Sequence, residues 1–308
     1  MKFKNLNDAA YHFLKELQIK EQNLEKIIST NSQVKDSYKE EIVELTQQFY
    51  EIENANDLMI NNSVLKQHSF WAISELMTEI LAINPPIMDK YSPQIMEWSY
   101  NLKPNRKARY LYGCRWEEFD QLFNTFNKFK KNPNTKKAVI SIYSPYDTNP
   151  EYADVPCTLM YHFLLRDKKM DMTTFYRSHD LFSGFKYDAL LSGFVLNSLC
   201  SWLRAEDIDV QPGKLFFFDG SLHYYPKKDG DKLLTAIESH SSDILENKIS
   251  VITNNISVDN YFKQLRLVQD TEAAAHYQNM SLARKISRSI QYQPFRYFAE
   301  TYIKKNEK

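Results

Sequence analysis

The stretch from Phe185 to Leu203 constrains the fold most, because it is long, apolar and bordered by β-rich segments. It holds two charged side chains, Lys186 and Asp188, and predicts a long apolar helix. Three predicted strands precede it closely, at Ala138–Tyr143, Leu159–Leu165 and Met170–Tyr176, and a β-rich run at Lys214–Phe218 follows it. This mixture of strands and helices predicts an α+β fold.

The rest of the chain is mostly helical in pattern. The first fifty or so residues carry apolar positions at helical spacing (Ala10, Phe13, Leu14 and Leu17), followed by a helical or extended segment at Ile42–Ile52. Ser69–Leu81 and Trp116–Lys130 are expected to form helices, as is the charged chain after Pro226. Because there is no internal repeat or low-complexity linker, we expect residues 1–308 to form a single domain.

Composition excludes several classes of protein. Lys plus Arg and Asp plus Glu are equal at 39 each, so no nucleic-acid or membrane partner is expected. Cys114, Cys157 and Cys200 are too scattered for a disulfide framework or a zinc site, and no apolar leader or span is visible. We therefore expect a cytoplasmic protein without a metal. With six glycines and no glycine-rich phosphate loop, side chains would have to bind any phosphate.

Three polar motifs interrupt the β-rich part of the chain. They are Val155-Pro156-Cys157, Arg177-Ser178-His179-Asp180 and Gly220-Ser221-Leu222-His223-Tyr224-Tyr225. Cys157 alone reads as a buried structural cysteine, but a thiolate beside Arg177 would be a nucleophile. Arg177 offers a guanidinium fork for phosphate, with a surface salt bridge as the alternative. His223 and Tyr225, two apart on an extended segment, would point the same way toward a sugar hydroxyl, unless His223 is a core histidine.

In order and spacing, these motifs resemble the active site of the thymidylate synthase family. Tyr112-Gly113-Cys114-Arg115-Trp116 and Glu75-Leu76 are similar to further family motifs. The resemblance covers about residues 69–226. It divides the chain into a divergent helical region (1–65), a catalytic core (66–226) and a divergent helical region (227–308) that lacks the family's short apolar tail.

The resemblance implies the family's fold, a mixed sheet packed with helices whose sheet forms a homodimer interface. It also implies a pyrimidine nucleoside monophosphate as substrate and 5,10-methylenetetrahydrofolate as co-substrate. Cys157 would add to C6 of the pyrimidine, and His223 and Tyr225 would hold the 3′-hydroxyl. Arg177, Ser178 and Asp180 would bind the nucleotide. Lys136 and Lys137 stand where the family has two arginines that reach the partner subunit's phosphate site, or are a solvated pair.

The remaining site residues are placed around the co-substrate. Glu75 lies among apolar neighbours in its helix, which suits an acid that handles protons through water, although Glu79 is an equal candidate for the inward acid. The resemblance assigns Tyr112, Trp116, Asp180 and Gly184 to co-substrate binding. Tyr112 and Trp116 are alternatively pocket wall or core.

Asp188 decides the expected substrate. The family reads the uracil edge with an asparagine at this position, and Gly184-Phe185-Lys186-Tyr187-Asp188 supplies an aspartate instead. A carboxyl group accepts from N4 of cytosine and shares a proton with N3, so Asp188 favours cytosine; a helix N-cap is the alternative. The pattern is that of the deoxycytidylate and cytidylate 5-hydroxymethylases. Thymidylate synthesis from dUMP and a catalytically idle nucleotide-binding relative remain as alternatives.

Overall fold

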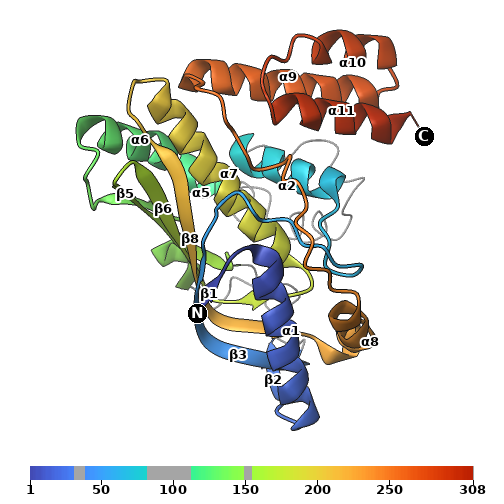
Figure 1. The fold of residues 1–308 in the computed structure, drawn as a ribbon. Helices are drawn as coiled ribbons and strands as arrows, with labels where there is room; N and C mark the ends of the chain where they lie inside the picture. The colour runs from blue at the N-terminus through green and yellow to red at the C-terminus, as the bar shows by residue number, and fades with distance from the viewer. Residues whose placement is uncertain (31–38, 82–111, 149–154, 308) are drawn as a thin grey trace.

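The computed structural model describes residues 1–30, 39–81, 112–148 and 155–307, and is built on an eight-stranded mixed sheet (Figure 1). Its strands are β1 (Lys2–Phe3), β2 (Ile27–Thr30), β3 (Lys39–Ile52), β4 (Ala138–Ser141), β5 (Thr158–Arg166), β6 (Lys169–Tyr176), β7 (His179–Asp180) and β8 (Gln211–Tyr224). The order is β1-β3-β8-β6-β5-β4, with β2 on β3 and β7 on β8. Strands β6 and β8 run parallel, whereas β8 is antiparallel to β3 and β5 is antiparallel to β6. The predicted α+β fold with a mixed sheet is confirmed.

The helices are α1 (Leu6–Gln22), α2 (Ser69–Leu81), α5 (Tyr112–Glu117), α6 (Gln121–Lys131), α7 (Gly184–Arg204), α8 (Pro226–Glu238), α9 (Val258–His276), α10 (Met280–Ser287) and α11 (Phe295–Asn306). A short 3-10 helix spans Pro145–Thr148. Within the described ranges, no helix combines the length and apolarity needed to cross a bilayer.

Helix α7 is the centre of the core and extends the predicted Phe185–Leu203 helix by one residue at each end. It packs on β6 and β8, and all of its residues are buried except Gly184, Tyr187, Asp188 and Arg204. A helix buried on every side needs apolar residues all round, which its sequence supplies. Three of its four less buried residues lie in the first two turns, where α7 reaches the candidate site.

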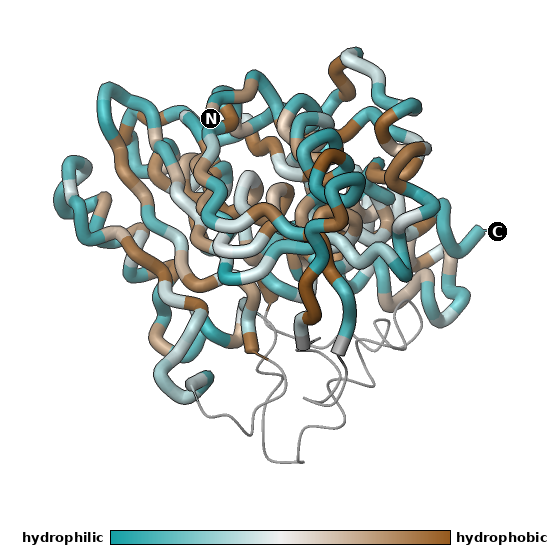
Figure 2. The backbone as a smooth tube through the Cα atoms, turned by 90° about the horizontal axis from the view of Figure 1, so that it is seen from below, coloured by the Kyte–Doolittle hydropathy of each residue, from teal (hydrophilic) through white to brown (hydrophobic). Residues whose placement is uncertain are grey.

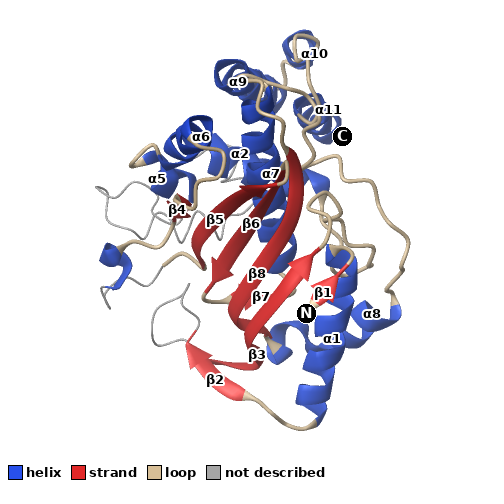
Figure 3. Ribbon diagram, turned by 60° about the vertical axis from the view of Figure 1, so that its left-hand side comes forward, coloured by secondary structure: helices blue, strands red, loops and turns tan. Residues whose placement is uncertain are grey.

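The face of the sheet that is turned away from α7 carries a surface of aromatic side chains. Phe49 of β3 is 51% exposed and stacks on Phe216 of β8, with ring centroids 6.2 Å apart. Phe218 of β8 lies 5.9 Å from Phe175 of β6. Figure 3 shows this face of the central strands with the helices behind it, and no described helix covers it.

The N-terminal region is not entirely helical, which corrects the expectation for residues 1–65. Helix α1 forms as predicted, but β2 and β3 follow it. In β3, Val43 and Leu45 are buried while Glu44 and Thr46 are more exposed, and this alternation is the pattern of a strand. Because β3 pairs with β8 along most of its length, the N-terminal region is an integral part of the sheet.

Two predicted elements have different bounds. The Trp116–Lys130 helix is divided into α5 and α6, because Asp120 takes a left-handed conformation with φ of 49° that an α-helix cannot include. The strand expected at Lys214–Phe218 continues to Tyr224. The longer strand brings Asp219 and His223 into the sheet beside β6 and β7.

The C-terminal helices α9, α10 and α11 lie together beyond the end of α7 and against α2 (Figure 1). The hydroxyl groups of Ser74 in α2 and Tyr302 in α11 are 3.3 Å apart. Hydrophobic and hydrophilic segments alternate along the described chain (Figure 2). In α9 the buried residues Tyr261, Leu265 and Val268 recur at helical spacing, as expected where one side of a helix is buried. Helix α2, which carries Glu75, is therefore held between the core and the C-terminal helices. The Pro85-Pro86 pair, expected to end this region, falls outside the described residues.

Candidate active site

Cys157 and Arg177 meet at one end of the β5–β6 hairpin. Cys157 directly precedes β5, Arg177 directly follows β6, and the two strands are antiparallel, so these ends coincide. The Arg177 Nη2 atom lies 3.8 Å from the Cys157 Sγ atom, and the Arg177 backbone N–H donates to the Cys157 carbonyl at 2.9 Å. A guanidinium beside a thiol favours the thiolate, the nucleophilic form.

The Arg177 guanidinium also fixes the segment before the cysteine. Its Nε donates to the Pro156 carbonyl at 2.9 Å and its Nη2 to the Val155 carbonyl at 2.7 Å. These bonds hold the Pro156-Cys157 segment and leave Arg177 half-buried at the edge of the site, with Ser178 half-buried beside it. Arg177 is thus placed to orient Cys157, and its binding of an anionic ligand stays a prediction.

Asp180, His223 and Tyr225 form a polar group where β7 pairs with β8. The Asp180 carboxylate accepts from the Phe182 N–H at 2.9 Å and from the Ser183 hydroxyl at 2.6 Å, and so shapes the turn before α7. His223 is buried, and this burial lowers its pKa. The rings of His223 and Tyr225 lie edge to face with centroids 5.3 Å apart, side by side as their spacing predicts.

Asp188 lies inside α7 rather than at its cap. Ser183 precedes the helix and Asp188 is its fifth residue, so the alternative of an N-cap for Asp188 is wrong. The Asp188 side chain is 13% exposed, and its burial raises the pKa of the carboxyl to about 6. A Cβ atom at Gly184 would stand 3.0 Å from the Asp188 Oδ2 atom, so glycine leaves room for this carboxylate.

Two acids of α2 point inward. Burial, with a contribution from the Asp188 charge, raises the pKa of Glu75 to about 8, and the Glu75 Oε2 atom has no hydrogen-bond partner among the described residues. Glu79 is buried, and its Oε2 accepts from the Gly113 N–H at 2.9 Å. Glu75 is half-buried with its Oε2 atom turned inward, and Glu79 is a second inward acid with a structural partner.

Tyr112 lies within electrostatic range of two of these groups. Burial raises the pKa of its phenol, and the charges of Asp188 and then Cys157 raise it further. The nucleophile candidate and the base-reading candidate thus act on the same side chain, and the charge of Asp188 also raises the pKa of the inward acids Glu75 and Glu79. Within the described ranges, no cluster of three or more His, Cys, Asp or Glu residues is arranged to hold a metal ion.

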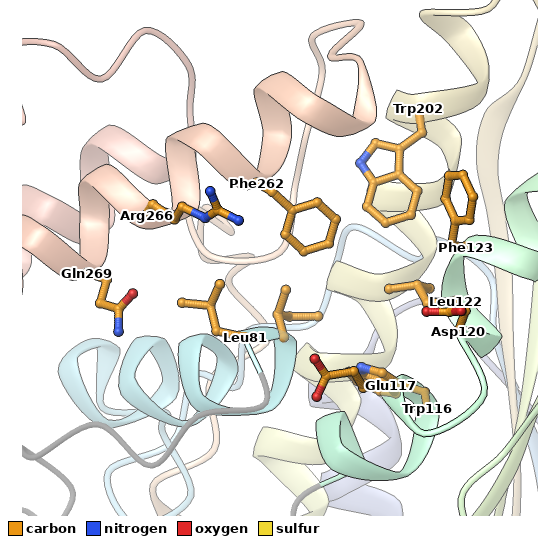
Figure 4. Close-up of a pocket in the computed structure, with 11 residues that line it drawn as sticks. Leu81, Trp116, Glu117, Asp120, Leu122, Phe123, Trp202, Phe262, Arg266 and Gln269 are labelled. Carbon is orange, nitrogen blue, oxygen red and sulfur yellow. The ribbon is translucent and has the colours of Figure 1, made fainter.

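Three predicted site residues lie apart from this group. Lys136 and Lys137 are exposed before β4, where the Lys136 carbonyl lies 3.3 Å from the His162 Nε2 atom. Trp116 is buried beside Tyr161 and lines a different cavity of about 370 Å³ (Figure 4). That cavity also contacts Trp202, which comes 14 residues after Asp188 and therefore roughly 21 Å further along α7.

Sequence reasoning missed two buried residues, His179 and Asp219. The His179 Nδ1 atom lies 3.0 Å from the Asp219 Oδ1 atom, and the His179 Nε2 atom lies 3.5 Å from the Asp188 Oδ2 atom. A signal was present in Arg177-Ser178-His179-Asp180, because alternate residues of an extended segment face opposite sides. His179 therefore faces the core while Ser178 and Asp180 face the other way, and a carboxylate closing the apolar run Leu215–Phe218 needs a buried partner.

Comparison with known proteins decides the family. The family model for thymidylate synthase matches residues 16–294, which is most of the chain. The chain belongs to the thymidylate synthase family. Thymidylate synthases and their relatives are one-carbon transferases that act on pyrimidine nucleoside monophosphates with 5,10-methylenetetrahydrofolate as co-substrate. The predicted resemblance is confirmed, and it extends well beyond residues 69–226.

Individual relatives match shorter stretches. A deoxyuridylate hydroxymethyltransferase of Bacillus phage SP01 is 33% identical over 127 residues, which is 40% of this chain and 32% of the phage protein. A putative thymidylate synthase of Methanosarcina mazei is 32% identical over 168 residues, covering 50% of this chain and 74% of that protein. A thymidylate synthase of Listeria monocytogenes serotype 4a is 25% identical over 146 residues, 45% of each chain. The match thus spans about a third of the phage enzyme and just under half of the Listeria enzyme.

Proposed function

We propose that this chain transfers the one-carbon unit of 5,10-methylenetetrahydrofolate to C5 of dCMP or CMP and that water completes a 5-hydroxymethyl product. The observation that carries the proposal is Asp188, a largely buried carboxyl in the second turn of α7. The charges of Asp188 and Cys157 both raise the pKa of the Tyr112 phenol, which supports placing the base-reading group and the nucleophile in one site.

The chemistry of the pyrimidine edge favours cytosine. Cytosine presents an N4 amino donor and an N3 acceptor, whereas uracil presents an O4 acceptor and an N3 donor. A carboxyl accepts from N4 and gives a proton to N3. Because burial raises the pKa of Asp188 to about 6, its protonated form is accessible near neutral pH. An ionised Asp188 facing uracil would place a negative oxygen against O4, which costs binding energy.

The reaction begins at Cys157. Its thiolate, beside Arg177, adds to C6 of the base, the C5=C6 electron pair shifts toward C4, and C5 becomes a carbon nucleophile. C5 then bonds to the methylene carbon of the co-substrate. Loss of the C5 proton then expels tetrahydrofolate and leaves an exocyclic methylene on C5. Water adds to this methylene and gives up a proton, which forms the hydroxymethyl group, and the electron pair returned to the ring expels the Cys157 thiolate and restores the C5=C6 bond.

Glu75 is the group that favours water as the final reactant. With a pKa raised to about 8, it keeps its proton at neutral pH, and its Oε2 atom has no hydrogen-bond partner among the described residues. A buried oxygen without a protein partner is suited to hold a water. The phage relative, named a deoxyuridylate hydroxymethyltransferase, provides independent support for hydroxymethyl transfer.

The same relative supports a second candidate, hydroxymethylation of deoxyuridylate, and the Listeria and Methanosarcina relatives support methylation of dUMP. Asp188 opposes both, because each requires uracil in the site. A catalytically idle nucleotide-binding role is opposed by the contact between Cys157 and Arg177, since a binding protein has no need of a thiolate beside a guanidinium.

The proposal includes a cytoplasmic homodimer with no nucleic-acid or membrane partner. The aromatic surface formed by Phe49, Phe175, Phe216 and Phe218 supports the dimer, because no described helix covers it. Exposed apolar patches of this kind mark interfaces. The exposed Lys136 and Lys137 would then be free to reach a partner subunit's phosphate site. The equal numbers of acidic and basic residues support the absence of a nucleic-acid partner.

A substrate competition tests the function. Purified protein is incubated with the co-substrate and an equimolar mixture of CMP, dCMP, UMP and dUMP, and each nucleotide is followed by chromatography. Depletion of a cytidylate, absent in Cys157→Ser, is expected. Depletion of a uridylate alone would refute cytosine selection, and no depletion would favour the idle relative.

A further inference from the structure

His179 is a buried imidazole placed between two carboxylates. It is 2% exposed; its Nδ1 atom lies 3.0 Å from the Asp219 Oδ1 atom, and its Nε2 atom lies 3.5 Å from the Asp188 Oδ2 atom. Asp219 is 0% exposed, and its carboxylate can only accept, so the proton on Nδ1 is committed to it. The second exchangeable proton of the pair therefore sits either on Nε2 of His179 or on Asp188.

The surroundings hold this arrangement. The His179 ring stacks on Tyr176 with centroids 4.1 Å apart and lies 5.2 Å from the ring of Phe185. The space beside it is kept open by Gly184, where a Cβ atom would approach both the Asp188 carboxylate and the imidazole. The ionisable groups around His179 are Tyr50 of β3, Tyr176 of β6, Asp180 of β7, Asp188 of α7, and Asp219 and His223 of β8, with Glu75 of α2 beyond Asp188.

We propose that His179, fixed by Asp219, is a positioning residue that supplies Asp188 with the proton it gives to N3 of the base. The inference rests on the proposed cytidylate function and deepens it, because it assigns Asp219–His179–Asp188 as the relay that makes the site specific for cytosine. The Nε2–Oδ2 separation of 3.5 Å closes to a hydrogen bond with a shift of about 0.5 Å.

The proton balance of the addition step defines the role of the relay. When the Cys157 sulfur bonds to C6, the C5=C6 pair forms C4=C5 and the C4=N3 pair moves onto N3. The one proton shared by the pair passes from Nε2 of His179 to Asp188 and from Asp188 to N3, which leaves Asp188 ionised and Nε2 without a proton. When Cys157 leaves, N3 returns its proton to the His179–Asp188 pair. No oxidant or further reactant is required.

Uracil does not need this relay. Its N3 already carries a hydrogen, and the charge that develops on adding a thiolate to C6 falls on O4. A proton supplied through Asp188 to N3 therefore assists cytosine alone. The relay predicts that its members control the rate of addition to cytidylates and have much less effect on addition to uridylates.

The electrostatics of the three residues agree with a shared proton. Burial lowers the pKa of His179, but the charge and hydrogen bond of Asp219, with the charges of Asp188 and Asp180, raise it above its ordinary value overall. Burial raises the pKa of Asp188, His179 lowers it and Asp219 raises it. Asp219 thus promotes retention of the proton at both positions.

The test uses release of tritium from C5 of labelled cytidylate and uridylate, which reports thiol addition before the co-substrate reacts. For the wild type with cytidylate, the rate is expected to fall at alkaline pH as the His179–Asp188 pair loses its proton. In Asp219→Asn that decline moves to lower pH by about one to two units, because a charged hydrogen bond has been lost. In His179→Gln, kcat falls about 100-fold or more with KM little changed.

Exposed His68 provides the matched control, and His68→Gln should retain the wild-type profile. A wild-type cytidylate profile without an alkaline decline would overturn the relay even if a variant failed to fold. The relay would also be overturned if the rate of Asp219→Asn declined at the same pH as that of the wild type. The same would follow if His179→Gln lost as much kcat with uridylate as with cytidylate. Tritium release from uridylate but not from cytidylate in the wild type would instead overturn the proposed function, and the relay with it.

Discussion

Replacing Asp188 with asparagine is expected to reverse the base preference while leaving the fold intact. Asparagine is isosteric with aspartate, and position 188 is inside α7 with a side chain that is 13% exposed, so no cavity or clash results. The amide can still accept from N4 of cytosine, but it cannot release a proton to N3. The loss is therefore expected in kcat for cytidylate rather than in KM.

The magnitude follows from two effects. Loss of a positioned general acid costs about 10²-fold to 10⁴-fold in rate. For uridylate, replacing a negative oxygen opposite O4 with an amide donor removes an unfavourable polar contact of about 1–3 kcal/mol, or roughly fivefold to 150-fold in binding. Together they predict that the ratio of kcat/KM for cytidylate to that for uridylate falls by at least about 500-fold.

The assay is steady-state kinetics of Asp188→Asn and wild type on dCMP, CMP, dUMP and UMP, with circular dichroism to confirm folding. Gly184→Ser is a useful companion, because a Cβ atom at Gly184 would press on the Asp188 Oδ2 atom and is expected to impair both bases. If the cytidylate to uridylate ratio changes less than about tenfold in Asp188→Asn, Asp188 does not read the base and the account of specificity is refuted.

Three further predictions concern the nucleophile, the C-terminal helices and the sheet. Cys157→Ser should abolish turnover, measured as product formation, while Cys114→Ser in α5 should keep it; turnover by Cys157→Ser would exclude this thiol as nucleophile. Burial raises the pKa of Glu272 to about 8, so this carboxyl stabilises the fold below its unfolded pKa and loses that contribution as the pH rises through about 8. Glu272→Gln should therefore raise the Tm relative to wild type at pH 9 but not at pH 5, and equal shifts at both would contradict the assignment. Phe49→Glu together with Phe218→Glu should convert a dimer to monomers in light scattering, and an unchanged dimer would show that the interface lies elsewhere.

The sequence predicted those elements of the fold whose patterns are local. The apolar run Phe185–Leu203 and the two strands before it, β5 and β6, were placed within one residue, because burial on all sides and alternation are both visible in a short window. β3 was left ambiguous between helix and strand, since its partner β8 lies some 170 residues away in the chain. Long-range pairing of this kind leaves no local signal.

The residues of the candidate site also separate into those with a local sequence signal and those without one. The residues that carry motif chemistry (Cys157, Arg177, Asp188) were predicted from order and spacing, and their roles stay predictions. His179 and Asp219 were missed because each gains its meaning from a partner on another element, α7 in one case and β7 in the other. Lys136 and Lys137 remain a prediction, since their proposed target belongs to a second subunit.

The measurement that tests the account most directly is mass spectrometry of the products formed from each nucleotide separately with 5,10-methylenetetrahydrofolate. The account predicts that dCMP or CMP gains CH2O, that tetrahydrofolate is released, and that the added hydroxyl carries the label when the reaction is run in ¹⁸O water. A uridylate that gains a methyl group, with dihydrofolate released, would contradict it.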